Sequence, residues 1–71
     1  MRRVEIEGRI QQLGGSCPSR TLRVGQALVY TTAATRYDDV TCATLRNGMS
    51  VEVDGMLMSD GRIRADRIEG D

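Results

Sequence analysis

The two cysteines, Cys17 and Cys42, are the residues of this 71-residue chain with the most specific chemistry. The elements expected below would place them near one end of a small barrel. A disulfide between them would close a loop of about 26 residues and stabilise the fold by about 3.5 kcal/mol on the chain-entropy description. A reactive thiol would instead need a neighbouring base or cation; the chain has no histidine, and Arg20 is the candidate cation. Two inert, reduced cysteines are the third alternative, and we expect the disulfide.

A second group of residues suggests a binding face on one side of a sheet. We expect this face to be formed by Thr21, Arg23, Leu28 and Tyr30, with Arg20, Arg62 and Arg64 at its rim. Arginine beside tyrosine suits base stacking or cation–π contact, but single-strand binders usually present several aromatic side chains. A solvated sheet with cross-strand pairs of arginine and carboxylate is the simpler interpretation. In a third interpretation, Leu28 and Tyr30 contact a second copy of the chain or another domain.

The acidic residues offer weaker candidates. Asp38 and Asp39 are interpreted as the N-cap of a short helix, because no spacing typical of a calcium loop follows them. Four further carboxylates occupy outward strand positions: Glu5, Glu7, Glu52 and Asp54. A pair of catalytic carboxylates is conceivable there, but the expected barrel offers no obvious cleft. We therefore expect neither catalytic residues nor a metal site nor a cofactor.

Composition limits the function classes further. Ten arginines balance ten acidic residues, so the formal net charge is zero. This argues against a protein that depends on the nucleic-acid phosphate backbone, where an excess of basic residues supplies most of the affinity. No apolar run approaches the roughly 18 to 20 residues of a membrane span. The first residues, MRRVEIEG, lack the apolar stretch of a signal peptide, so we expect a cytoplasmic protein or an exported domain whose leader is missing.

Two near-identical words, VEIEG at Val4–Gly8 and VEVDG at Val51–Gly55, predict the main strands. Apolar and charged residues alternate in both, which is typical of a half-buried strand. Each word ends on a glycine in the inward phase. Glycine weakens a strand unless the backbone must bend or another segment must come close. We interpret the words as two corner-turning strands of one closed sheet.

The remaining elements are short. Further strands are expected at Thr21–Val24, Ala27–Thr31 and Arg62–Ile68, with a bulge or strand end near Asp66 and Arg67. Residues 13–19 are expected to form a loop, and a helix of one or two turns is expected within residues 38–48. The order predicts an all-β fold: a small five-stranded Greek-key barrel like the oligonucleotide/oligosaccharide-binding (OB) barrels, with one short helix between strands three and four. An SH3-like barrel is the nearest competitor.

A family resemblance spans nearly the whole chain. The segments that carry it are Val4–Gly8, Gly14–Pro18, Ala34–Tyr37, Cys42–Leu45, Gly48–Gly55 and Asp60–Ala65. In this order and spacing they resemble a bacterial domain family of unknown function, whose members are small OB-like barrels often repeated in exported or lipid-anchored proteins. The resemblance implies this fold and, where the cysteine pair is present, an oxidising compartment. The chain differs in lacking a leader, in standing alone and in having Tyr37 where phenylalanine is common.

We therefore expect a single domain over residues 1–71 that acts as a non-catalytic binding or structural module of the bacterial envelope, in the periplasm or another extracytoplasmic compartment. Its partner would be a protein, a small ligand or a second copy bound through the face of the second and third strands. The alternative is a cytoplasmic OB barrel that binds single-stranded nucleic acid.

Overall fold

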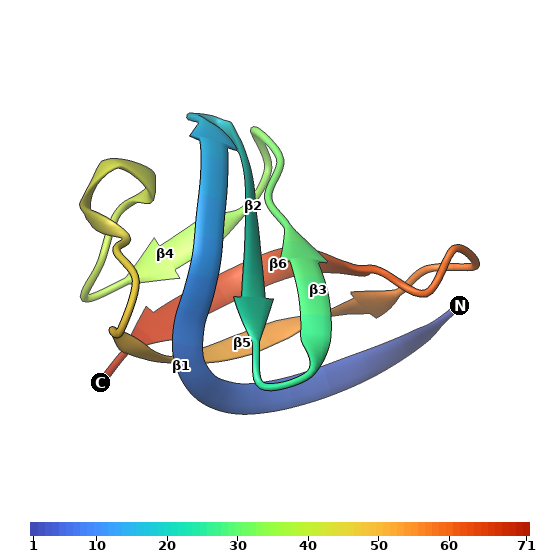
Figure 1. Cartoon of the computed structure of the whole chain (residues 1–71). Helices are drawn as coiled ribbons and strands as arrows, with labels where there is room; N and C mark the ends of the chain where they lie inside the picture. The colour runs from blue at the N-terminus through green and yellow to red at the C-terminus, as the bar shows by residue number, and fades with distance from the viewer.

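The chain folds as an all-β barrel in the computed structural model, which describes residues 1–71. Its elements are β1 (Arg2–Ser16), β2 (Ser19–Val24), β3 (Ala27–Tyr30), β4 (Arg36–Asp38), a 3₁₀ turn η1 (Cys42–Thr44), β5 (Ser50–Leu57) and β6 (Ile63–Gly70). Five strands follow the order β3-β2-β1-β5-β6, and a parallel pairing of β3 with β6 closes the sheet on itself (Figure 1). The short β4 also pairs with β6, in parallel. The structure contains no helix with the length and apolar character needed to cross a membrane.

The first of the two repeated words lies in a strand that turns a corner, as predicted. β1 pairs with β5 over Arg2–Arg9 and with β2 from Ile10 onward, so one strand serves both halves of the sheet. Figure 1 shows its strong curvature. Gly8 lies at the change of partner, where a Cβ would be 3.4 Å from the Val24 side chain and from the Gly25 nitrogen.

The second word contains a glycine that the sheet requires. The register between β5 and β6 shifts after Asp54, which opposes Arg67, whereas Gly55 opposes Ala65. Asp66 is therefore the extra residue of a bulge, at the position predicted from the sequence. A Cβ on Gly55 would collide with the Arg64 carbonyl oxygen, because the two backbones approach closely there.

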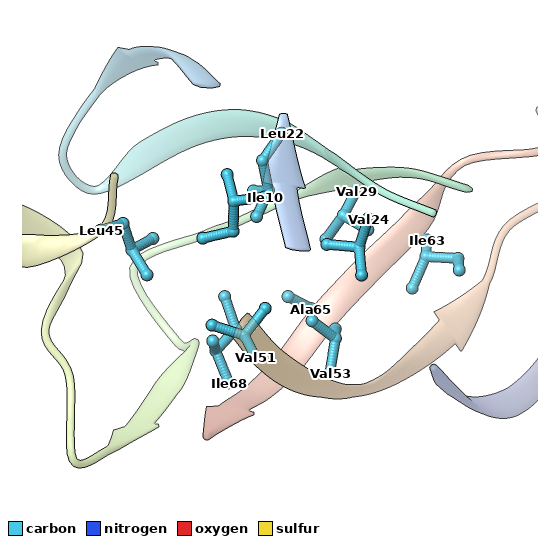
Figure 2. Packing of buried hydrophobic residues seen from close by; sticks show 10 residues of the cluster. All are labelled: Ile10, Leu22, Val24, Val29, Leu45, Val51, Val53, Ile63, Ala65 and Ile68. Carbon is cyan, nitrogen blue, oxygen red and sulfur yellow. The ribbon is translucent and has the colours of Figure 1, made fainter. Parts of the chain in front are cut away.

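The core follows the alternation of the strands. Its ten buried members are Ile10, Leu22, Val24, Val29, Leu45, Val51, Val53, Ile63, Ala65 and Ile68 (Figure 2). In the two repeated words the apolar residues face inward, as the alternation predicts. Val4 and Ile6 are only partly buried, although they pack against the same cluster. Branched aliphatic side chains thus fill the barrel without any Phe or Trp.

The segment between β3 and β5 differs from the prediction of a one- or two-turn helix. Arg36–Asp38 form a strand, and the helical part is the three-residue 3₁₀ turn η1. Asp38 and Asp39 do not cap it. The cap is Thr41, whose hydroxyl accepts from the Thr44 backbone N–H at 3.2 Å, while the Thr41 N–H donates to the Thr44 hydroxyl at 2.9 Å. Parallel pairing with β6 holds the preceding residues extended, which local sequence does not reveal.

The expected loop at residues 13–19 is also mostly strand. β1 continues to Ser16 and forms a hairpin with β2, with Cys17 and Pro18 at its tip. Between the pairs Gln11–Arg23 and Gly14–Thr21, two residues of β1, Gln12 and Leu13, stand against the single Leu22 of β2. The turn-forming composition therefore marks a bulge and a tight turn.

Candidate functional site

The disulfide between Cys17 and Cys42 is present, as expected. Their Cα atoms are 6.0 Å apart, and the bond joins the tip of the β1–β2 hairpin to η1. Cys17 is exposed and Cys42 is half-buried. The bond therefore fastens the connection between β4 and β5 to one end of the barrel, and it leaves no free thiol in the chain.

Arg20 lies at this end of the barrel and not at the rim of the expected binding face. It lies on the same side of β2 as the buried Leu22 and Val24. Its Nη1 donates to the Cys42 carbonyl oxygen at 3.1 Å, and its Nε is buried without a hydrogen-bond partner. Its backbone N–H donates to the Thr31 hydroxyl at 2.8 Å. Arg20 thus belongs to the surroundings of the disulfide.

The other six candidate residues gather on the outer side of three strands, which we call the β2–β3–β6 face: Thr21, Arg23, Leu28, Tyr30, Arg62 and Arg64. Thr21 opposes Tyr30 and Arg23 opposes Leu28 in the antiparallel pair of β2 with β3. Tyr30 also pairs with Arg64 across the barrel closure. Register therefore brings Arg64 to Tyr30 although they lie more than thirty positions apart, and Arg62 directly precedes β6.

The arginines of the β2–β3–β6 face already have partners within the chain. The Arg62 guanidinium carbon lies 4.4 Å from the centroid of the Tyr30 ring, and its Nε donates to Asp60 at 2.9 Å. Arg64 donates to Asp66 at 3.1 Å. Leu28 is 40% exposed, which makes it the one large apolar side chain on this face that is open to solvent.

A second cluster, which we call the carboxylate face, lies on β1, β5 and β6. Glu5 opposes Asp54, Glu7 opposes Glu52, and Glu52 also opposes Glu69. Glu5, Glu52 and Asp54 each bring one carboxylate oxygen within 4.8 Å of the others, although exposed acidic groups often cluster in this way without a metal ion. Glu5 and Asp54 also line a surface depression with Arg3 and Val4. The sequence predicts outward positions for Glu5, Glu7, Glu52 and Asp54 but does not reveal their grouping, because the pairing register decides it.

Electrostatics distinguishes the carboxylate face from the rest of the surface. Glu5, Glu7, Glu52 and Asp54 form no ion pair with an arginine. The chain has five arginine–carboxylate pairs within 4.0 Å, and only the pair of Glu69 with Arg67 involves this face. A hydrogen bond to Asp54 and its negative charge raise the pKa of Glu5. Partial burial, followed by repulsion from Asp54 and Glu69, raises the pKa of Glu52. Like charges opposed across a sheet destabilise it, so these side chains lower the stability of the barrel.

Replacing Glu52 with glutamine is expected to stabilise the barrel at neutral pH. Because the pKa of the Glu52 carboxyl is raised in the wild-type fold, the folded chain binds the proton of that carboxyl more tightly than the unfolded chain does. Stability then falls as pH rises from about the ordinary value of 4.5 through the raised pKa. Urea unfolding at pH 7 should show a higher midpoint for Glu52→Gln, and the gain should disappear below that range. A lower midpoint at pH 7 would contradict the repulsion.

The matched control for this prediction is Asp60→Asn. A backbone and a side-chain hydrogen bond from Arg62 lower the pKa of Asp60 below 3.8. Its stabilising contribution is present above that value and is lost as pH falls through the lowered pKa. Removing the charge should therefore lower the unfolding midpoint at pH 7, opposite in sign to Glu52→Gln.

Fold and site define a small closed barrel in which a disulfide fixes one end and two charged faces lie on the outer surface. Residues 3–69 match the model of a domain family described as a domain of unknown function, DUF5666. The chain belongs to this family. Comparison with curated proteins and with solved structures found no match.

Proposed function

We propose that the chain is a non-catalytic binding or structural module of the bacterial envelope that contacts a protein partner through the β2–β3–β6 face. The observation that carries this proposal is the exposed Leu28 beside Tyr30, surrounded by arginines on one sheet face. Tyrosine and arginine are enriched in protein interfaces, where they contribute much of the binding energy. A small ligand bound to the same residues is the other form of this proposal.

We also propose that the barrel is OB-like. A closed sheet of five strands with a strongly bent first strand supports this assignment. OB barrels bind their ligands with the outer face of strands two and three, which here is the face that carries Leu28 and Tyr30. The family fold does not define the ligand, because one architecture supports many activities.

An extracytoplasmic location is part of the proposal. A disulfide between Cys17 and Cys42 is compatible with an oxidising compartment, because intracellular thiols are usually kept reduced. The alternative is a cytoplasmic barrel that binds single-stranded nucleic acid. The Tyr30 ring favours it as a stacking platform, but Arg62 already lies over that ring and the net charge is zero.

Self-association through the β2–β3–β6 face is the first partner contact to test. If a second copy binds there, Leu28→Asp should weaken the dimer at least tenfold, because a buried apolar contact becomes a buried charge; tenfold corresponds to about 1.4 kcal/mol. Sedimentation velocity over a range of protein concentrations measures this change. Ala33→Asp, which adds the same charge at an exposed residue outside this face, should leave the association unchanged.

The nucleic-acid alternative makes the opposite prediction. Short single-stranded oligonucleotides should then bind with an affinity that falls steeply between low and moderate salt and that is lost in Tyr30→Ala. Fluorescence anisotropy with a labelled oligonucleotide tests this directly. Salt-sensitive binding of this kind would overturn the proposed protein-interaction function.

A further inference from the structure

The two sulfurs of the disulfide lie in different environments. Cys17 is at the tip of the β1–β2 hairpin and is exposed, whereas Cys42 is half-buried in η1. An attacking thiolate must approach one sulfur along the axis of the bond, opposite the sulfur that leaves. Cys17 is therefore the more accessible of the two residues to a thiolate that arrives from solvent.

Arg20 adds a chemical difference to this difference in access. Its Nη1 donates to the backbone carbonyl of Cys42, which places the guanidinium beside that residue. Its Nε is buried and has no partner, so one charge-bearing donor is unused at this end of the barrel. A neighbouring guanidinium stabilises a thiolate relative to a thiol. Cys42 is therefore the better leaving group of the two.

We propose that Cys17 is a site of reversible modification by external thiols, with Cys42 as the leaving thiolate. The external thiolate attacks Cys17 Sγ and forms a mixed disulfide, and the Cys17–Cys42 bond breaks as its electron pair moves to Cys42 Sγ. The Cys42 thiolate then attacks Cys17 Sγ again, restores the original disulfide and releases the external thiolate. Each exchange consumes and releases one thiolate, so no other oxidant or reductant is needed.

The contacts around η1 keep Cys42 close to Cys17 after the bond opens. Leu45, directly after η1, is buried in the core. Asn47 accepts a hydrogen bond from the Leu13 backbone N–H at 2.9 Å, and Arg20 still holds the Cys42 carbonyl. The reciprocal capping hydrogen bonds between Thr41 and Thr44 also remain. The opened form is therefore arranged for rapid closure.

Peptide mapping after brief exposure to a thiol tests the direction of attack. The oxidised protein is mixed with glutathione, quenched with acid at early times and alkylated, and the modified peptides are identified by mass spectrometry. We expect glutathione on Cys17 with the alkyl group on Cys42 to exceed the reverse arrangement by roughly fivefold or more, since both access and leaving-group stability favour it. Equal amounts, or an excess of glutathione on Cys42, would overturn the proposal.

Variants of Arg20 test its part in the reaction. Arg20→Gln should slow opening by roughly threefold and move the product ratio toward one, because the leaving thiolate loses its cation. Arg20→Lys, which keeps the charge, should retain the wild-type preference. It is the variant to measure if Arg20→Gln does not fold, and a loss of the preference in it would contradict the role of the charge. Arg46→Gln, which removes an exposed cation four positions after Cys42, should change neither quantity. A glutamine variant with the wild-type rate and ratio would exclude the role of Arg20.

Discussion

Replacing both cysteines, in Cys17→Ser/Cys42→Ser, is expected to lower the free energy of unfolding by about 3.5 kcal/mol. The disulfide joins residues 25 positions apart, so its loss restores the conformational freedom of that loop in the unfolded chain. For a domain of this size such a change is a large fraction of total stability, since whole domains are stable by only about 5 to 15 kcal/mol. Urea unfolding of wild type and variant measures the difference.

The barrel itself should survive this substitution. None of the five barrel-forming strands contains Cys17 or Cys42, and the core residues lie on those strands except for Leu45. We therefore expect the far-ultraviolet circular dichroism spectrum to remain that of the wild type at low temperature. Chemical reduction of the wild type is the matched control and should lower stability by a similar amount. A loss below about 1 kcal/mol would show that the disulfide contributes little to this fold.

Both thiols should resist alkylation in the folded, oxidised protein and react only after reduction. The intact mass of natively isolated protein, alkylated with and without prior reduction, checks this. Free alkylation of both cysteines in folded protein from its native source would contradict the proposed oxidising compartment.

Gly55→Ala is expected to destabilise the barrel by about 3 kcal/mol, at the upper end of the usual range for inserting a group into a packed interior. The new Cβ would collide with the Arg64 carbonyl oxygen and lie 3.1 Å from the Arg64 carbonyl carbon and 3.0 Å from Ile63 Cγ2. Two of these atoms belong to the backbone of β6, which cannot rotate away as a side chain can. Relief therefore requires a shift of the strand pairing at the bulge.

Gly8→Ala is the matched control for Gly55→Ala. The sequence presents the two glycines in the same word, but a Cβ on Gly8 meets its nearest atoms at 3.4 Å, which is ordinary contact. We expect a loss of less than about 1 kcal/mol, because no backbone has to move. Denaturant unfolding of the two variants side by side gives the comparison. Equal losses would show that the two positions are equivalent after all.

The main strands and their inward phases could be predicted from local sequence because alternation of apolar and charged residues is a local consequence of a half-buried sheet. For the same reason the inward residues of the second word, Val51 and Val53, belong to the core as their alternation predicts. The corner in β1 and the bulge at Asp66 also left local signals, in a mid-strand glycine and in a break of phase at Ile68. The pairing of Cys17 with Cys42 could be expected because two cysteines allow one intramolecular bond.

Local sequence was therefore enough to predict an all-β chain, its alternating core positions and its disulfide, whereas the surroundings of these features depend on tertiary contacts. β4 went unpredicted because three residues carry no period and owe their conformation to parallel pairing with β6. The sequence allows Arg20 either beside the cysteines or at the rim of the binding face, and a contact with Cys42, 22 residues away, decides between the two. The carboxylate face and the β2–β3–β6 face both arise from strand register. Register is a long-range property, so the local sequence around a residue does not reveal which residues will be its neighbours on the sheet.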